Sequence, residues 1–224
     1  MKIWAFVSQK GGSGKSTLAT QLGVYASQCG EKTIIVDLDP QGSAKTWHAI
    51  RGDGQAPAVV KTPHNKVDAV MKAIRQTGAF DLVLIDTPPH SDKIVDKAIR
   101  LADLIVCPTR PANFDIESLR DTARLIDLSD ALGRSLVVVN CAPTTKGAAK
   151  AHKLVSDRIC RLGMPVAQTI ISDRRAYVTA TDKGKGVTEM SDARATAEIQ
   201  KLWGAINKVW PSAIKAKEKA NGQK

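Results

Sequence analysis

The stretch that decides the fold is Lys10-Gly11-Gly12-Ser13-Gly14-Lys15-Ser16-Thr17, which directly follows a short apolar run, Ile3–Ser8. A helical pattern over residues 15–29 comes next, so the order is strand, glycine-rich loop and helix. Glycines allow backbone N–H groups to turn inward around phosphate oxygens, and the N-terminus of the following helix adds partial positive charge. The stretch therefore predicts a phosphate site whose cradle is formed by Gly11, Gly12, Ser13, Gly14, Lys15, Ser16 and Thr17.

Two side chains of this loop have specific chemistry. Lys15 is long enough to reach the β- and γ-phosphates of a bound nucleotide, and the Ser16 hydroxyl is a ligand for Mg²⁺. The general P-loop pattern, G-x-x-x-x-G-K-[ST], begins with a glycine where this chain has Gln9. The loop thus departs from the general pattern, and it adds a second lysine, Lys10.

Short apolar runs alternate with helical patterns along the rest of the chain. The runs are continuous, which is typical of strands that are covered on both faces. This alternation predicts an α/β fold with a doubly wound, mostly parallel sheet and helices on both faces. Residues 51–65 are predicted to be irregular. The predicted strands are Ile3–Ser8, Thr33–Asp37, Leu82–Asp86, Leu104–Pro108, Leu136–Asn140 and Val166–Ile171, and the predicted crossover helices are 15–29, 66–77, 115–132 and 147–162.

Acidic residues stand at the ends of two predicted strands. Asp37 and Asp39 end or follow the second strand, and Asp86 closes the strand Leu82–Asp86 in the manner of a Walker B acid. Ligands collect at the carboxyl ends of strands in open α/β sheets. We therefore expect Asp86, together with Ser16, near a bound Mg²⁺.

Charge is unevenly distributed along the 224 residues, whose formal net charge is +11. Residues 1–140 hold 17 basic and 15 acidic side chains, whereas residues 141–224 hold 16 basic and 7 acidic ones. Such a basic region favours a polyanionic partner, either nucleic acid or an anionic membrane. No apolar run approaches the ~20 residues of a membrane-spanning helix, and the four cysteines lie too far apart for a zinc site.

The last predicted helix spans about residues 192–210, where apolar residues recur on one face. Pro211 is expected to stop it. The expected organisation is a single P-loop ATPase domain over residues 1–210, followed by a frayed, basic C-terminal tail over 211–224.

Several motifs together resemble the deviant Walker A ATPases of the ParA/MinD family, most of all the small ParA-type partition ATPases. The resemblance rests on Lys10–Ser16, on Asp37-Leu38-Asp39-Pro40-Gln41-Gly42 and on Pro108-Thr109-Arg110-Pro111, and covers about residues 1–210. It implies an ATPase in which two protomers sandwich two MgATP. Lys10 would then reach the partner's phosphates, Asp39 would orient the attacking water, and Asp37 would help to hold the Mg²⁺ shell.

The base is predicted to be adenine. Ras-type GTPases read guanine with N-K-x-D, whereas here the corresponding strand end is Asn140-Cys141-Ala142-Pro143, which lacks both the lysine and the aspartate. By family resemblance Asn140 would contact the adenine.

The resemblance also implies partners. A ParA-type protein is cytoplasmic and nucleoid-associated, dimerises with ATP, binds double-stranded DNA without sequence preference, and is released when a cargo-linked, ParB-like activator stimulates hydrolysis. The cargo would be a plasmid, a chromosome or a protein assembly. The residues expected to contact DNA phosphates are Lys146, Lys150 and Lys153, which share one helical face, together with Arg174 and Arg175.

Two alternatives remain at this point. A MinD-like membrane-associated positioning ATPase would carry a C-terminal amphipathic helix, but after Pro211 only Ile214 is strongly apolar, so stable membrane insertion is not expected. A metabolic P-loop enzyme that activates a carboxylate with ATP is disfavoured by Lys10 and by Asp39-Pro40-Gln41.

Overall fold

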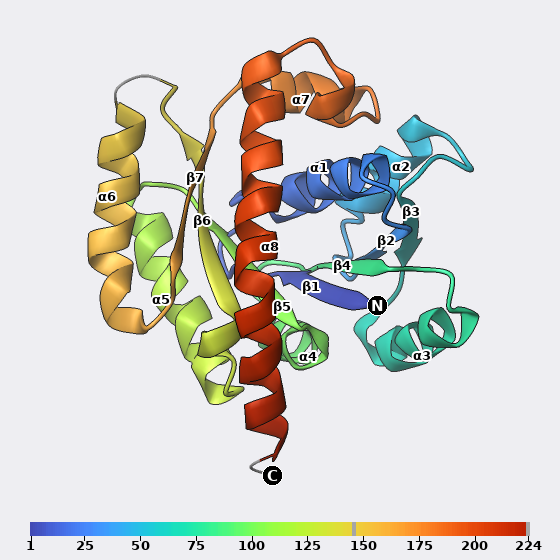
Figure 1. Ribbon diagram of the computed structural model, residues 1–224, viewed down its shortest axis with the longest axis horizontal. Coiled ribbons are helices and arrows are strands. Elements are labelled where there is room, and N and C mark those ends of the chain that lie inside the picture. Colours follow the sequence, from blue (N-terminus) through green and yellow to red (C-terminus); the bar gives the residue numbers. More distant parts are fainter. Residues whose placement is uncertain (145–146, 223–224) are drawn as a thin grey trace.

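A seven-stranded sheet forms the centre of the computed structural model, which describes residues 1–144 and 147–222 (Figure 1). Its strand order is β3-β2-β4-β1-β5-β6-β7, and each neighbouring pair is parallel. The predicted fold class is therefore confirmed. The strands are β1 Lys2–Phe6, β2 Thr33–Asp37, β3 Ala58–Lys61, β4 Leu82–Asp86, β5 Leu104–Thr109, β6 Ser135–Ala142 and β7 Val166–Ser172.

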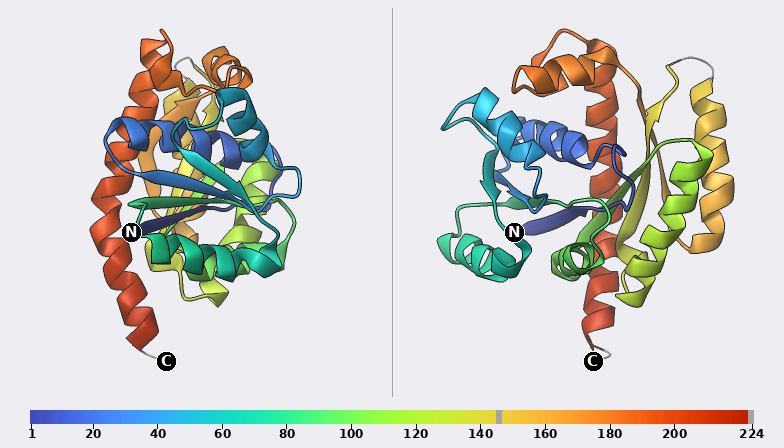
Figure 2. Two further views of the ribbon diagram at one scale, coloured as in Figure 1. Left: turned by 90° about the vertical axis from the view of Figure 1, so that its right-hand side faces the viewer. Right: turned by 180° about the vertical axis from the view of Figure 1, so that it is seen from behind.

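Helices cover both faces of the sheet, as the views in Figure 2 show. One hydrophobic core lies between the sheet and helices α3 to α6, and the other lies between the sheet and helices α1, α2, α7 and α8. Each strand sends alternate side chains into the two cores, which explains its continuous apolar sequence. The α-helices are α1 Lys15–Gln28, α2 Ser43–Arg51, α3 Val67–Thr77, α4 Asp92–Leu101, α5 Asn113–Leu128, α6 Gly147–Ile159, α7 Arg175–Asp182 and α8 Ala193–Gly222.

The register of the central strands brings acidic residues together. Strand β4 lies between β2 and β1, and Asp86 at its end is the register partner of Asp37 on one side and of Phe6 on the other. The glycine-rich loop follows β1, so it begins beside the ends of β4 and β5, and the end of β2 lies next beyond β4. One edge of the sheet therefore holds the phosphate loop and both strand-end aspartates.

Several short elements escape the sequence prediction. Part of the segment that was expected to be irregular, Ala58–Lys61, forms the edge strand β3, whose backbone pairs with β2. The sequence prediction did not include this strand because it is only four residues long. Helices α2, α4 and α7 were also not predicted. Each is ten residues or shorter, so its periodicity is too brief to distinguish it from a loop.

The prediction that Pro211 ends the last helix is wrong. Helix α8 continues through Pro211 to Gly222, so the residues that were expected to form a frayed tail are helical. Beyond the proline, Ala213 is completely buried, and the Lys217 ammonium bonds the Leu101 carbonyl and pairs with Asp103. These tertiary contacts outweigh the local cost of one missing helical hydrogen bond.

Candidate nucleotide site

The glycine-rich loop turns sharply between β1 and α1. Gly12 and Gly14 have φ angles of 72° and 97°, in the left-handed region that favours glycine. A Cβ at Gly14 would lie 2.0 Å from Nδ2 of Asn140, so close packing also excludes a side chain there. Helix α1 begins at the next residue, Lys15, and its N-terminus is aimed at the space enclosed by the loop.

Lys15 is almost fully buried under this loop. Its Nζ donates a hydrogen bond to the Lys10 carbonyl oxygen over 3.2 Å. Burial lowers the pKa of Lys15, and the carboxylates of Asp86 and Asp39 partly offset this by raising it. A buried ammonium with one carbonyl partner is well placed to bind an anion.

The three aspartates of the site have different surroundings. Both carboxylate oxygens of Asp37 accept backbone hydrogen bonds, from the N–H groups of Asp39 and Lys45, each over 3.0 Å. Asp39 in turn accepts one from the N–H of Gln41 over 2.9 Å. These contacts fix the turn that leads from β2 into α2, and they leave Asp39 beside the phosphate loop.

Asp86 has the most unusual environment. Its side chain is completely buried, and neither carboxylate oxygen has a hydrogen-bond partner among residues 1–144 and 147–222. Burial raises the pKa of Asp86 to about 7; the nearby hydroxyl of Ser16 and the ammonium of Lys15 lower it in part, whereas the charge of Asp37 raises it further. Such an acid is either protonated or, when charged, stabilised by a nearby cation.

These residues fit a magnesium ion. Mg²⁺ in nucleotide sites takes one or two protein oxygens, with waters and phosphate oxygens completing the shell. The unpartnered oxygens of Asp86 and the hydroxyl of Ser16 could supply such ligands, and each oxygen of Asp37 accepts one backbone hydrogen bond and keeps a second lone pair. In the described part of the chain, no group of three His, Cys, Asp or Glu residues is arranged to hold a metal ion.

Two connected cavities, each of about 380 Å³, open around the loop. Gly12, Gly14, Thr17 and Thr181 line both of them. The first cavity is also lined by Gly11, Lys15, Ser16 and Asp39, and the second by Arg110, Asn140, Ser172, Asp173, Tyr177 and Val178. The first therefore suits phosphates and a metal, and the second suits a base and its ribose.

Asn140 lies at the junction of the loop and the second cavity. Its Nδ2 donates a hydrogen bond to the Ser13 carbonyl oxygen over 2.7 Å. The structure thus places Asn140 on the wall of the cavity, where its side chain also holds the phosphate loop. Arg110, to which the sequence assigned no role, follows β5 and approaches Gly12 from the same cavity.

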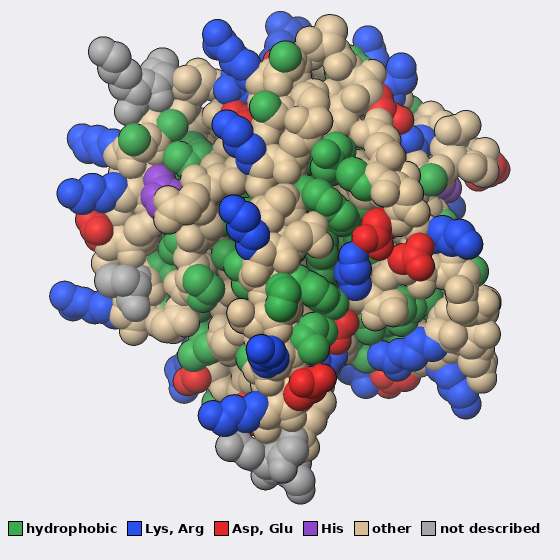
Figure 3. Space-filling view, viewed as in Figure 1, with side chains coloured by type: hydrophobic (Ala, Val, Ile, Leu, Met, Phe, Trp, Pro, Cys, Tyr) green, Lys and Arg blue, Asp and Glu red, His purple; other side chains and the backbone are tan. Residues whose placement is uncertain are grey.

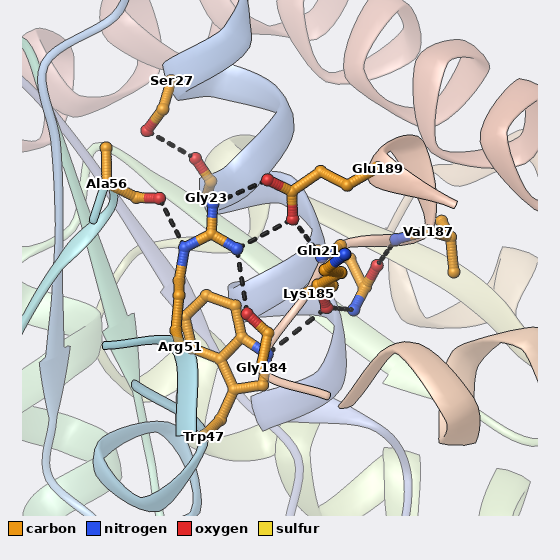
Figure 4. A network of polar contacts seen from close by, with 11 residues as sticks. Gln21, Gly23, Ser27, Trp47, Arg51, Ala56, Gly184, Lys185, Val187 and Glu189 are labelled. Atoms are coloured by element: carbon orange, nitrogen blue, oxygen red, sulfur yellow. Dashed lines mark hydrogen bonds and ion pairs between the residues drawn. The ribbon is translucent and has the colours of Figure 1, made fainter. Parts of the chain in front are cut away.

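The position of α2 is fixed by a network around Arg51 and Glu189 (Figure 4). The Arg51 guanidinium forms two 2.8 Å bonds to the Glu189 carboxylate and donates to the Gly184 carbonyl over 2.9 Å. Gln21 of α1 contacts the same loop through Lys185 and Val187. The helix that follows the Asp39 turn and the helix that follows the phosphate loop are thereby tied to one segment.

The residues expected to contact DNA are only partly brought together. Lys150 and Lys153 are exposed on α6, and Arg175 is exposed at the start of α7. Arg174, by contrast, is paired with Glu198 over 2.9 Å and largely covered. Lys146 lies outside the described residues.

The loop between a parallel strand and a helix, the buried lysine and the acids at the neighbouring strand ends define a P-loop nucleotide-binding protein. Residues 4–187 match the family model of the CobQ/CobB/MinD/ParA nucleotide binding domain, so the chain belongs to this family. The resemblance inferred from the sequence motifs is thereby confirmed.

Curated relatives agree with this assignment. The chain is 28% identical over 214 residues to the Maintenance of carboxysome distribution protein A of Gloeobacter kilaueensis, a match that covers 93% of this chain and 95% of the relative. It is 29% identical over 167 residues to the Chromosome partitioning protein ParA of Caulobacter vibrioides, a match that covers 57% of this chain and 62% of the relative.

The fold is shared with solved structures. The MinD cell division protein of Aquifex aeolicus superposes with a TM-score of 0.76 at 18% identity, covering 93% of this chain and 98% of that one. The Cyanothece apo McdA structure gives a TM-score of 0.73 at 19% identity, with 92% and 99% covered. At these identities the likeness establishes the fold.

Proposed function

We propose that this protein is a Mg²⁺-dependent ATPase that positions a cellular cargo by cycling between an ATP-bound, DNA-bound dimer and a released state. The observation that carries the proposal is the phosphate site, where a buried lysine and an unpartnered, buried Asp86 surround a loop that has an additional lysine, Lys10.

The residues divide the chemistry among them. Bound Mg²⁺ would neutralise charge on the phosphate oxygens, held by Ser16 and Asp86. Lys15 would bind the β- and γ-phosphates, and Asp39, held beside the loop by the N–H of Gln41, would orient the attacking water. Asp37 would keep the Asp39 turn in place through the two backbone hydrogen bonds that it accepts, and it would help to hold the Mg²⁺ shell.

Lys10 supports the proposed dimer. Its side chain makes no hydrogen bond or ion pair with the residues that the structure describes, although it stands at the rim of the phosphate loop. A cation in this position can reach the phosphates of a second protomer and add to transition-state stabilisation there. Hydrolysis would then depend on assembly.

The DNA-binding part of the proposal gains support from α8. Helix α8 carries a row of four exposed basic residues spaced seven apart: Arg194, Lys201, Lys208 and Lys215. None of the four forms an ion pair within the described chain. Seven residues advance a helix by about 10.5 Å, so the row extends for roughly 32 Å. Figure 3 shows Lys and Arg side chains following one another along this helix.

The row favours DNA over a lipid surface. A membrane-binding helix needs a free apolar face, but the apolar side of α8, including Ile199, Leu202 and Ile206, is completely buried against the sheet. None of the helices in the described part of the chain combines the length and hydrophobicity that a membrane crossing needs. Phosphate contacts by exposed lysines give salt-sensitive binding without sequence readout.

The cargo is proposed at the level of a class. Two relatives named for carboxysome distribution are matched over 95% and 96% of their length, whereas Protein ParA of Rhizobium radiobacter is matched over 81% and the chromosome-partitioning relative over 62%. We therefore favour a protein assembly over a plasmid or chromosome as the cargo, with an activator bound to it that stimulates hydrolysis.

The test is binding to a random-sequence DNA duplex, measured by fluorescence anisotropy with ADP and then with a slowly hydrolysed ATP analogue. We expect tight binding with the analogue alone. The double variant Lys201→Glu/Lys208→Glu should weaken it and reduce the slope of log K against log salt by about two. The control Lys66→Glu/Lys72→Glu makes the same change in charge at exposed positions just before and within α3, and it should bind normally. Equal, weak binding in both nucleotide states would refute DNA tethering, and liposomes would be tested next.

A further inference from the structure

One carboxylate, that of Glu198 on α8, organises the wall of the base-side cavity. It accepts hydrogen bonds from the Ser172 hydroxyl over 2.7 Å, from the Ser172 N–H over 3.2 Å and from the Tyr177 hydroxyl over 2.9 Å. It also pairs with the Arg174 guanidinium through two nitrogens, each over 2.9 Å. The Glu198 side chain is only 13% exposed, so water contributes little to these bonds.

The donors belong to the wall itself. Ser172 ends β7, Arg174 precedes α7, and Tyr177 lies in the first turn of α7; all three line the cavity beside Asn140. Segment 172–177 contains a change from strand to helix within three residues, and the backbone alone does not fix the direction of such a turn. Three of its side chains and one backbone N–H are instead directed at a single point on α8.

We propose that Glu198 is the positioning residue for the nucleotide base: it does not touch the ligand but holds segment 172–177 in the shape that receives it. This rests on the proposed nucleotide-binding function and adds a residue to which neither the sequence motifs nor the resemblance assigned a role. Hydrogen bonds to a carboxylate are roughly twice as strong as neutral ones. Without it the guanidinium of Arg174 would be left covered and unpaired, and the hydroxyl of Tyr177 would keep only its longer, 3.4 Å contact with the Ala195 carbonyl oxygen, so segment 172–177 would shift to find new partners.

The proposal predicts different effects on the phosphate-binding half and the base-binding half of the nucleotide site. The phosphate half is built by the glycine-rich loop, Lys15 and Ser16, and it contains none of the donors to Glu198. Loss of Glu198 should therefore weaken the binding of a ligand that has a base, and should leave the binding of a bare polyphosphate unchanged. A residue that only stabilised the fold would affect both ligands equally.

The experiment compares ADP with inorganic tripolyphosphate, each with Mg²⁺, by isothermal titration calorimetry. Glu198→Gln keeps the shape of the side chain but turns an amide group toward donors, and we expect it to raise the Kd for ADP about tenfold while the Kd for tripolyphosphate stays within about twofold. Glu218→Gln is the matched control, because it makes the same change at an exposed position of α8. Its affinity for both ligands should equal that of the wild type.

A second variant makes the test independent of the folding of the first. Tyr177→Phe removes the hydroxyl, which donates to Glu198 over 2.9 Å and also lies 3.4 Å from the Ala195 carbonyl oxygen, and it should produce a smaller loss of about threefold that again affects ADP alone. Unchanged ADP binding in both variants, or equal losses for ADP and tripolyphosphate, would overturn the proposal. If the wild type failed to bind ADP, the proposed function would be wrong and this inference would fail with it.

Discussion

The buried carboxyl of Asp86 should make the metal-free protein less stable as the pH rises. Its pKa is about 7 in the folded chain, compared with 3.8 for an ordinary aspartate. Between these two values the folded protein retains a proton that the unfolded chain has released. The free energy of unfolding therefore falls as the pH rises through this range, and above pH 7 the loss is complete.

The expected size follows from linkage. Each pH unit in this interval corresponds to about 1.4 kcal/mol, so raising the pH from 5 to 7 should lower the free energy of unfolding by roughly 2 kcal/mol through this group alone. Asp37, Asp39, Lys15 and Ser16 face Asp86 and stay in place when it is replaced. Asp86→Asn removes the titrating group with little change in volume.

Urea unfolding with EDTA and without nucleotide, at several pH values from 5 to 8, measures the effect. The wild type should lose stability with rising pH more steeply than Asp86→Asn, by about 2 kcal/mol over two units. The exposed Asp68 provides the control, since Asp68→Asn should preserve the wild-type slope. Parallel pH profiles for the wild type and Asp86→Asn would show that the folded protein does not retain this proton.

Three other perturbations test the remaining parts of the site and the fold. Lys15→Ala should weaken ADP and ATP binding about 100-fold in calorimetry, because it removes a charged donor from the phosphates; near-normal affinity would contradict its role. Asp39→Ala should bind ATP and stay dimeric in size-exclusion chromatography while its turnover falls about 100-fold; wild-type turnover would exclude it from water activation. Deletion of residues 211–224 should lower the free energy of unfolding by about 2 kcal/mol, because the buried Ala213 and the Lys217–Asp103 pair are lost; an unchanged urea midpoint would mean that this part of α8 contributes nothing.

The sequence predicted those elements that are determined by a continuous pattern of neighbouring residues. Strands such as Thr33–Asp37 and Leu82–Asp86 were predicted with their observed bounds, because short, unbroken β-branched and aliphatic runs between polar segments are typical of buried parallel strands. The phosphate loop could also be predicted from the sequence, because its sharp turn needs glycines. Gly12 and Gly14 have the positive φ angles that favour this residue.

What the sequence could not supply depends on distant contacts. Nothing near Pro211 indicates that Asp103 and Leu101, more than a hundred residues away, would hold the end of α8 in place. The role of Glu198 is hidden for the same reason, because its donors come from positions 172–177 and no spacing rule connects them with α8. The row from Arg194 to Lys215 becomes one surface only once the helix is known to be continuous.

The two strand-end acids, Asp37 and Asp86, differ in whether their carboxylate oxygens have hydrogen-bond partners. Buried polar atoms in folded proteins almost always have partners, so an unpartnered buried carboxylate at a strand end is available to a ligand. Asp37 and Asp86 are register partners on neighbouring strands and both are completely buried, yet Asp37 uses its oxygens on the backbone of its own turn while both oxygens of Asp86 lack partners in the described chain. The same lack of a partner affects the hydroxyl of Ser13 in the phosphate loop. A cation beside Asp86 and a phosphate within the loop would satisfy these groups together, which is why we propose Asp86 as a metal ligand and give Asp37 a positioning role in addition to the one proposed for it in the Mg²⁺ shell.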